Sequence, residues 1–408
     1  MTEHTNTPEL RFPEFKDEWK LQKLGNLAQF SKGKSLSKKD LNINGKPCIL
    51  YGELYTKYGA ILNKVYSKTS TQNDSLVFSK RNQILIPSSG ETDIDIATAT
   101  AIDTDVKIAI GGDLNIITPI NSDGRFISLY INGKGKYNLA KYAQGKSVVH
   151  LYNSDIKKLN FYLPTNMAEQ KKIGDFFSKL DRQIELEEKK LELLEQQKKG
   201  YIQKIFSQEL RFKDENGNNY PNWEMKKLGN IANIVGGGTP STKKSEYWDG
   251  DINWFSPVEI GDKEFVSTSQ RRITEKGLEK SSAKVLPIGT VLFTSRAGIG
   301  KTAILSKEAT TNQGFQSIVP KENDLDSYFL YSMTSILKRD AEKVGAGSTF
   351  SEVSRKQMEQ IKLLIPILKE QKQIGRLFQI INRKINKQIH KIELLKQRKK
   401  GLLQKMFV

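Results

Sequence analysis

One segment of this sequence occurs twice, and that duplication restricts the possible folds more than any other feature. Residues 168–206 and 369–407 align at an offset of 201 positions without a gap, and 19 of the 39 aligned pairs are identical. A shorter string, Glu9-Leu10-Arg11-Phe12, returns at 209–212. The chain is therefore a divergent tandem repeat of two units, each of about 200 residues.

The repeated segment is predicted to be a long amphipathic helix. Its apolar residues recur at heptad spacing in both copies, which is typical of a helix that packs against another helix. Asn166 is the expected N-cap of the first copy, and Glu169 completes a capping box with it. Gly200 and Gly401 mark a break or a close packing point. The predicted helix-pairing residues are Leu180, Ile184, Leu191, Leu194, Ile381, Ile385, Ile392 and Leu395.

Charge indicates how the two helices are paired. The first copy has five glutamates in its middle, between Glu185 and Glu195. The second has five basic residues over the matching region, between Arg383 and Lys396. We expect the helices to pack on each other, with opposite charges adding selectivity more than stability. The alternatives are that each helix packs on its own domain or on a second chain.

Between the repeated segments the units share a skeleton of strands rather than a sequence. The runs Ile84-Leu85-Ile86 and Val291-Leu292-Phe293 are short and apolar, as expected of buried strands. An alternating pattern before Pro164 and Pro366 indicates one further strand in each unit. We therefore predict a mixed α/β fold. The predicted division is two domains, at 1–167 and 209–368, and two long helices, at 168–208 and 369–408.

The composition favours a polyanionic partner. The formal net charge is +19, and such an excess in a protein of the cytoplasm favours nucleic acid. Residues 369–408 hold 12 basic and 2 acidic side chains, which is about half of the excess. The sequence has no apolar run long enough for a membrane span, and its N-terminus lacks the features of a signal peptide. We therefore expect a cytoplasmic protein with no membrane partner.

Two basic, hydroxyl-rich loops occupy the same place in both copies and are candidates for contacts with DNA phosphates. They are 31–39 in the first unit and 236–244 in the second. Arg296 is the candidate for a contact with a base edge, because guanine is the usual partner of arginine. The predicted DNA-binding residues are Lys32, Lys34, Lys38, Lys39, Thr239, Lys243, Lys244, Arg271, Arg272, Arg296 and Lys301.

Sequence patterns for catalysis or cofactors are weak. The string 295–302 ends like a phosphate-binding P-loop, but Ser295 stands where that loop needs a glycine. The acidic pairs Asp93/Asp95 and Asp103/Asp105 are best interpreted as solvated strand faces. One cysteine and three widely spaced histidines argue against a disulfide, a thiolate cluster or a histidine metal site. We expect a binding protein without catalytic residues, metal or cofactor.

Four groups of residues follow one another in the second unit: Trp223 with Lys227-Leu228-Gly229, Gly237-Gly238-Thr239-Pro240 followed by Tyr247-Trp248, Arg296-Ala297-Gly298-Ile299-Gly300-Lys301, and Pro366 followed by Glu370-Gln371 and Ile374. With these strings the chain resembles the DNA-specificity subunit of type I restriction-modification enzymes over nearly its whole length. The first unit departs from the pattern, with Pro87-Ser88-Ser89-Gly90 where the second has Thr294-Ser295-Arg296-Ala297, as two domains reading different sequences would.

The resemblance implies two target-recognition domains separated by two long antiparallel coiled-coil helices. Each domain is expected to read one half of a bipartite, asymmetric site in double-stranded DNA. The helices are expected to dock two modification subunits, to which ATP-dependent restriction subunits are added. The alternative is a coiled-coil scaffold whose two modules bind protein or RNA. A lone nuclease or methyltransferase is a third possibility, which the absence of the usual motifs disfavours.

Overall fold

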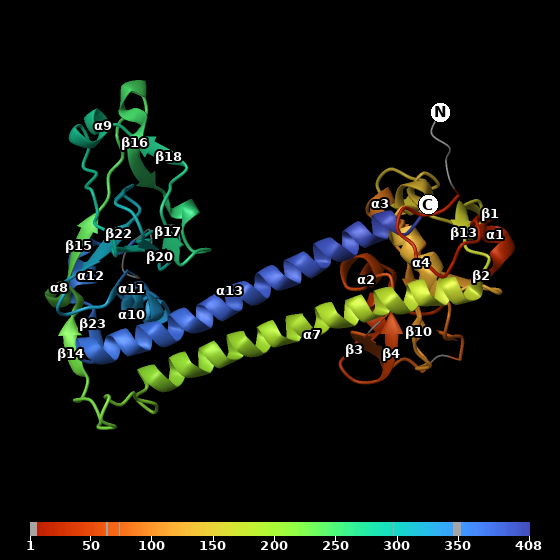
Figure 1. Ribbon diagram of the computed structural model, residues 1–408, viewed down its shortest axis with the longest axis horizontal. Coiled ribbons are helices and arrows are strands. Elements are labelled where there is room, and N and C mark those ends of the chain that lie inside the picture. Colours follow the sequence, from red (N-terminus) through yellow and green to blue (C-terminus); the bar gives the residue numbers. More distant parts are fainter. Residues whose placement is uncertain (1–5, 63, 73, 297, 346–351) are drawn as a thin grey trace. The chain divides into compact units, whose positions relative to one another are not determined.

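The structure is a computed structural model that describes residues 6–62, 64–72, 74–296, 298–345 and 352–408. Ala297 of the motif noted above lies outside the described residues. The chain forms two compact units (Figure 1). Unit 1 is Met1–Lys190 with Gln388–Val408, and unit 2 is Leu191–Lys387. Each unit is a mixed α/β domain that includes part of both long helices, so the predicted fold class is confirmed.

The elements of unit 1 are short, apart from the long helices. Its strands are β1 (Lys20–Lys23), β2 (Ala28–Lys32), β3 (Leu41–Asn42), β4 (Lys46–Ile49), β5 (Ser67–Thr69), β6 (Val77–Phe78), β7 (Ile84–Pro87), β8 (Ser89–Gly90), β9 (Thr100–Ala101), β10 (Ala109–Ile110), β11 (Leu114–Pro119), β12 (Val149–His150) and β13 (Asn160–Leu163). Its helices are α1 (Leu24–Leu27), η1 (Lys38–Asp40), α2 (Tyr51–Thr56), α3 (Asp93–Ile96), α4 (Gly124–Asn132), α5 (Lys136–Ala140) and α6 (Asn153–Ile156).

Unit 2 follows the same order with fewer strands among the described residues. Its strands are β14 (Glu224–Lys227), β15 (Ala232–Gly236), β16 (Trp248–Phe255), β17 (Phe265–Val266), β18 (Arg271–Ile273), β19 (Val291–Phe293), β20 (Thr302–Leu305), β21 (Thr310–Thr311), β22 (Gln316–Pro320) and β23 (Lys362–Ile365). Its helices are α8 (Leu228–Ile231), η2 (Ser245–Tyr247), η3 (Pro257–Glu259), α9 (Glu275–Glu279), α10 (Ser327–Ser332), α11 (Thr334–Gly345) and α12 (Arg355–Gln360).

The central sheet has the same pairing in both units. Its order is β2-β11-β7-β9 in unit 1 and β15-β22-β19-β20-β17 in unit 2. A second sheet contains one parallel pair in each case, β4 with β10 and β16 with β21. An antiparallel pair, β1 with β13 or β14 with β23, carries the chain into each long helix. The strand skeleton predicted from the apolar patterns is therefore confirmed.

The apolar runs at the centre of each sheet are buried because both faces of the strand are covered. Ile84 and Ile86 contact the core that includes α4 and the long helices, whereas Leu85 faces a second core toward β10. Val291 and Phe293 face the matching core of unit 2, and Leu292 faces the second one. A continuous apolar run is what such a doubly covered strand requires.

The long helices are α7 (Met167–Phe206) and α13 (Leu368–Lys405). Both continue through the glycines at which a break or close packing was predicted. A Cβ atom on Gly200 or Gly401 would meet no other atom within 4 Å, so that prediction was wrong. An isolated glycine in open space lowers helix propensity without ending the helix.

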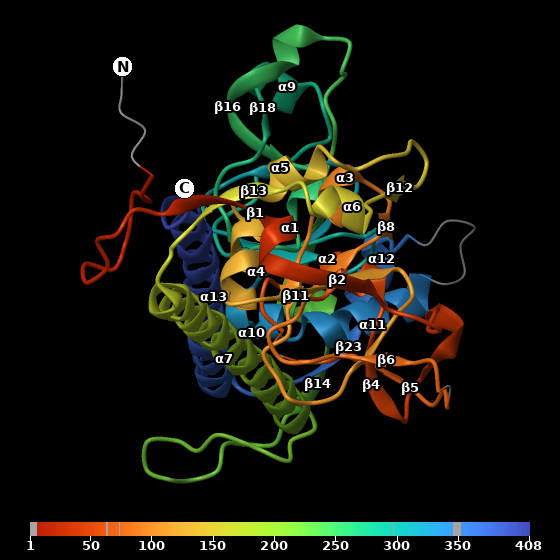
Figure 2. The ribbon, with the colours of Figure 1, turned by 90° about the vertical axis from the view of Figure 1, so that its right-hand side faces the viewer.

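The two helices lie beside each other (Figure 2), and the order of the residues in their ion pairs shows that they run antiparallel. In unit 1, Lys396 Nζ lies 2.6 Å from Glu188 Oε1, and Lys399, further along α13, pairs with Asp181, earlier on α7. Glu187 accepts from both Gln388 and Lys391. The predicted pairing of opposite charges is therefore present for Lys391 and Lys396. Arg383, Lys384 and Lys387 form no ion pair with any described carboxylate.

The pairing in unit 2 is apolar rather than ionic. Leu191 and Leu194 of α7 pack in one core with Ile381 and Ile385 of α13. The ring of Phe206 stacks on that of Phe378 with their centroids 6.3 Å apart. In unit 1 the remaining predicted pairing residues are buried or half-buried: Leu180, Ile184, Ile392 and Leu395.

A buried carboxylate fixes the start of each long helix. Asn166 Oδ1 accepts from the backbone N of Ala168 as an N-cap, but Glu169 does not complete the predicted capping box. Its carboxylate instead accepts two hydrogen bonds from Arg11, at 2.7 and 2.8 Å, and one from the Trp19 indole at 3.3 Å. A carboxylate at this helix end also interacts favourably with the helix dipole.

Unit 2 repeats this arrangement with different residues. Glu370 accepts from Arg211 at 2.7 and 3.2 Å and from the Trp223 indole at 3.3 Å. The side chains of Glu169 and Glu370 are each only 1% exposed. We call each Arg-Glu-Trp set a carboxylate clamp. Since each clamp joins an entry segment to a helix start, it explains why the short string at 9–12 recurs together with the helix.

Candidate nucleic-acid interface

The basic loop of unit 2 follows β15 and is held by two tryptophans. The Trp254 indole donates to the Gly238 carbonyl at 2.8 Å, and the Trp248 indole donates to the Ser241 carbonyl at 3.2 Å. A Cβ atom on Gly237 would lie 2.0 Å from a backbone oxygen of Asn312, so only glycine fits there. The loop is therefore fixed at its base. Its lysines, Lys243 and Lys244, are exposed.

Arg271 extends this basic surface onto β18. Its guanidinium lies 3.6 Å from the centroid of the Trp248 ring, in a cation–π contact. The neighbouring Arg272 is exposed. The same tryptophan thus supports the basic loop through its N–H group and Arg271 through its ring face. The loop and Arg271 form one cationic surface on unit 2, whereas Arg272, the next residue of β18, points from the opposite face of the strand.

Three polar side chains gather beside that loop, where β15 and β19 end and β22 begins. Thr239 donates to the side chain of Gln313, which is exposed. The backbone N of Ser295 donates to the Gly314 carbonyl at 2.8 Å, which brings the half-exposed Arg296 next to the same turn. Gln313 was not singled out from the sequence. Its place in the sequence, in the turn before β22, does not indicate a role in binding. Its contact with Thr239 in the structure does.

Lys301 lies elsewhere. It is exposed, and it lines a cavity together with residues of α7, α11 and α13. Arg296 and the basic loop do not line that cavity. The structure thus brings together the predicted residues Thr239, Arg296 and those of the basic loop, and leaves Lys301 apart from them.

The basic loop of unit 1 follows β2, the counterpart of β15. Gly33 there has the same function as Gly237, since its Cβ atom would lie 2.0 Å from the Gly111 carbonyl oxygen. The side chain of Ser37 and that of Asp40 cap the short helix η1, which holds Lys38 and Lys39 at the surface. Lys32 and Lys34 are also exposed.

Two aromatic residues near Lys32 were missed in the sequence. The Lys32 ammonium lies 5.8 Å from the ring centroid of Tyr152, and that ring stacks on His150 with centroids 6.1 Å apart. The His150 Nδ1 atom is 3.2 Å from the hydroxyl of Ser89. Tyr152 is 44% exposed, and such an aromatic ring beside a lysine can stack on a base while the lysine contacts a phosphate. Nothing in the sequence places it near the loop at 31–39.

The predicted loop cations are free for a ligand, whereas other basic residues are neutralised within the fold. None of Lys34, Lys38, Lys39, Lys243 and Lys244 forms an ion pair with a described carboxylate. Unpaired, exposed lysines on anchored loops are what sequence-independent phosphate binding requires.

The acidic pairs of unit 1 have structural roles that differ from the predicted strand faces. Asp93 and Asp95 belong to helix α3. Asp103 and Asp105 both bind Arg81, at 2.6 and 2.9 Å. None of the four lies in a strand, and Asp103 and Asp105 neutralise Arg81, although Asp105 remains solvated.

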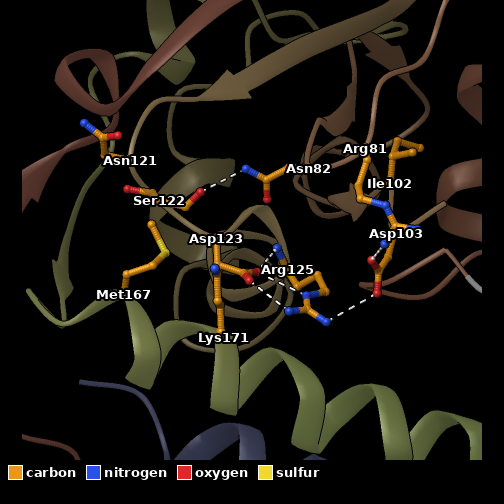
Figure 3. Close-up of a pocket in the computed structure, with 10 residues that line it drawn as sticks. All are labelled: Arg81, Asn82, Ile102, Asp103, Asn121, Ser122, Asp123, Arg125, Met167 and Lys171. Carbon is orange, nitrogen blue, oxygen red and sulfur yellow. Dashed lines mark hydrogen bonds and ion pairs between the residues drawn. The ribbon is translucent and has the colours of Figure 1, made fainter. Parts of the chain in front are cut away.

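A polar cavity of about 410 Å³ lies beside this ion-pair network (Figure 3). Arg125 projects into the network between Asp103 and Asp123, at 3.3 and 2.9 Å, and also reaches Asp175 of α7 at 2.6 Å. Its carboxylate neighbours raise the pKa of Arg125 despite partial burial. With three carboxylates around one guanidinium, the arrangement joins domain to helix and has little affinity for an anion.

The described part of the chain has neither a metal site nor a membrane span. No group of three or more His, Cys, Asp and Glu side chains there has the arrangement of a metal site. None of the helices described is long and apolar enough to cross a membrane.

Known proteins similar to this chain share one description. The family model described as the type I restriction modification DNA specificity domain matches residues 16–196 and 220–396. The MjaIX specificity subunit of Methanocaldococcus jannaschii is 37% identical over 174 residues, which cover 42% of this chain and 40% of that protein. The EcoR124I/EcoR124II specificity subunit of Escherichia coli is 35% identical over 159 residues, covering 37% and 39%. The chain thus spans about two fifths of the length of these two relatives.

Longer but weaker similarities extend over the whole chain. The MjaVIII specificity subunit of M. jannaschii is 23% identical over 421 aligned positions, covering 97% of this chain and 92% of that protein. The crystal structure of the type I restriction-modification S subunit from M. genitalium superposes with a TM-score of 0.64 at 18% identity, covering 98% and 99% of the two chains. That superposition shows a shared fold.

Proposed function

The chain belongs to the type I restriction-modification DNA-specificity family, and we propose that it is the subunit that recognises the DNA sequence in such a complex. Each unit reads one half of a bipartite, asymmetric site in double-stranded DNA. The chain carries no catalytic residues of its own and acts in the cytoplasm.

One observation carries this proposal: a cationic loop follows the equivalent strand, β2 or β15, in both units. Anchored loops with unpaired lysines suit the phosphate backbone, which gives affinity without sequence preference. The remaining loop residues differ between the units, as two different half-sites require. Two similar domains in one chain suit two half-sites in one DNA molecule.

Contacts with the phosphate backbone are assigned to the exposed lysines and arginines of the two loops and β18. Arg296 is assigned to a guanine edge, with Thr239 beside it. An Arg296→Ala variant should lose about 1–3 kcal/mol of binding free energy and relax specificity in one half-site only. Retention of wild-type affinity and of the same methylation pattern would remove this assignment.

The long helices are proposed to dock two modification subunits. Leu186 and Leu193 lie one heptad apart on α7 and are 50% and 56% exposed. Ile380 and Leu394 lie two heptads apart on α13 and are 53% and 51% exposed. Exposed apolar residues repeated at this spacing are typical of a surface that another helix covers. Restriction subunits join the complex in addition.

The deciding experiment maps methylated adenines in cells with and without the gene. A single bipartite motif should lose its methylation when the gene is deleted and regain it on complementation. The purified chain alone should transfer no methyl group, and should protect that motif once modification subunits are added. Unchanged methylation, together with RNA or protein recovered on the loop surfaces, would favour the scaffold alternative.

A further inference from the structure

The cavity lined by Lys301 contains a group of basic side chains that is separate from the DNA-binding loops. It lies in unit 2, has a volume of about 440 Å³ and is bounded by the turn before β20, by α11 and by the unit 2 parts of α7 and α13. Three lysines line it, Lys198, Lys301 and Lys338, and no carboxylate does.

The three ammonium groups are poorly neutralised by the protein. Among described carboxylates, only Glu342 forms an ion pair with one of them, at 3.8 Å from Lys338 Nζ. Burial lowers the pKa of Lys198, and the more distant Glu264 and Glu195 offset this only in part. Glu264 is itself engaged by Tyr328 and Asn382. Lys301 and Lys338 are exposed and Lys198 is half-buried, so the three positive charges are accessible to an anion that enters the cavity.

Glycines shape the cationic wall. A Cβ atom on Gly300 would lie 2.4 Å from the Lys338 side chain, so glycine is needed for that lysine to pack against the turn. Gly261 has a φ of +120° and approaches the stem of Lys301, where a Cβ atom would lie 3.3 Å away. The hydroxyls of Thr302 and Thr334 are 2.9 Å apart at the cavity wall. The Thr334 hydroxyl donates to the Tyr331 carbonyl, so the Thr302 hydroxyl donates to Thr334 and the two side chains fix this part of the lining.

The lining of the cavity also has an apolar and aromatic part. Tyr331, Phe378 and Ile202 form it, and burial raises the pKa of the Tyr331 phenol to about 12, so that the ring stays neutral. A cavity lined by three lysines and by an aromatic ring fits a phosphate joined to a planar ring. Its volume falls within the range of small-molecule sites.

We propose that this cavity binds the phosphate group of a nucleotide, with Lys198, Lys301 and Lys338 as its ligands and Tyr331 beside the nucleotide's base. The nucleotide is either free in solution or part of the DNA that the loops hold. This site goes beyond the proposed function, because it is separate from the loop surfaces and does not depend on the DNA sequence that they read.

The first test is calorimetric titration of the full chain with inorganic pyrophosphate and with AMP. Both should bind, and Lys301→Met and Lys198→Met should each weaken both by about tenfold, the loss expected for one charge-assisted contact. Lys301→Arg should restore most of the affinity. Tyr331→Leu should weaken AMP but not pyrophosphate. Lys356→Met is the matched control, since Lys356 is an exposed lysine on α12 of the same unit.

The second test measures the affinity for a duplex without the recognition motif, as a function of salt. If the phosphate belongs to DNA, Lys301→Met and Lys198→Met should each lower the slope of log K against log salt by about 1, whereas the control should not. Free-ligand binding lost in the variants supports a free nucleotide, and a lowered slope supports DNA. If neither occurs in folded variants, the site is refuted. Loss of the methylation motif alone would instead bear on the proposed function.

Discussion

The two units attach to the long helices by the same contacts but carry different loops. Each has a carboxylate clamp at the helix start. Each also has a glutamine one residue later, Gln170 or Gln371, that accepts from the backbone N of Asp123 or Asp326 at 2.9 Å. The loops after β2 and β15 share a position and a charge but little else. What is repeated is therefore the attachment of a domain to a helix, and what varies is the surface that meets the ligand.

A second contact between domain and long helix is made from the same position in both units, but by different side chains. Two residues after Asp123 stands Arg125, which reaches α7 through an ion pair with Asp175. Two residues after Asp326 stands Tyr328, whose hydroxyl contacts Glu264 and the Asn382 side chain of α13. The chemistry has changed from an ion-pair network to neutral and charge-assisted hydrogen bonds, while the function of joining domain to helix is kept.

The shared clamp should give the largest effect on stability. Glu370→Ala leaves Arg211 and the Trp223 indole without their acceptor in a buried site, and should lower the free energy of unfolding by about 3 kcal/mol. Glu169→Ala should do the same to unit 1. Urea unfolding followed by tryptophan fluorescence measures both. Glu195→Ala, at an exposed site on α7, is the control and should change stability little. A large effect in only one unit would contradict the equivalence of the clamps.

Variants of Arg125 and Tyr328 should lower the free energy of unfolding less than the clamp variants, and by unequal amounts. Arg125→Met removes three ion pairs and leaves Asp123 buried, so we expect a loss of about 2 kcal/mol. Tyr328→Phe removes one hydroxyl and should cost about 1 kcal/mol. Thermal unfolding of the two variants gives the comparison. Equal losses would mean that the ion pairs of Arg125 stabilise unit 1 no more than the hydroxyl of Tyr328 stabilises unit 2.

The loop lysines should affect DNA binding and not folding. Lys243→Gln with Lys244→Gln, and separately Lys38→Gln with Lys39→Gln, should each lower the slope of log K against log salt by about 2, because each lysine neutralises about one phosphate. The methylated sequence should stay the same. Filter binding at several salt concentrations provides the slope, with Lys356→Gln as the control. A slope that changes for one loop only would show that the other loop does not touch DNA.

Acid should slightly weaken the pairing of α7 with α13 in unit 1 and leave the apolar pairing of the same two helices in unit 2 unchanged. Hydrogen bonds from Gln388 and then Lys391 lower the pKa of Glu187 in the folded chain. That contribution is complete above the ordinary pKa of a glutamate and is lost as the pH falls through the lowered folded value. The apolar pairing of unit 2 has no such group among its four aliphatic residues. Hydrogen exchange along α7 near pH 4 should resolve the difference, and Glu187→Gln should abolish it.

The sequence predicted those features that depend on local pattern. The heptads predicted both long helices, the apolar runs predicted β7 and β19, and the alternating patterns before Pro164 and Pro366 predicted β13 and β23. The basic loops were found because charge and glycine recur at one place in both units. In physical terms, these features follow from which residues alternate or repeat along the chain.

The sequence did not predict features that depend on contacts between distant segments. Glu169 matches a capping box, yet Arg11, 158 residues away, takes its carboxylate. Gln313 and Tyr152 join their loops only through tertiary contacts with Thr239 and Lys32. Lys301 was predicted to bind DNA with the loop residues, but it lines a separate cavity with residues of α7, α11 and α13. No local pattern encodes such pairings.

The composition of unit 1 also has a consequence for synthesis on the ribosome. Unit 2 is continuous in sequence, whereas unit 1 includes residues 388–408. Phe407 is 1% exposed in the unit 1 core, with its ring centroid 5.1 Å from that of Phe126, and the backbone N of Leu10 donates to the Lys405 carbonyl at 2.9 Å. Domains usually fold in the order in which they are made. Here the second unit can complete its core first, and the first unit must wait for the last turn of α13 to emerge.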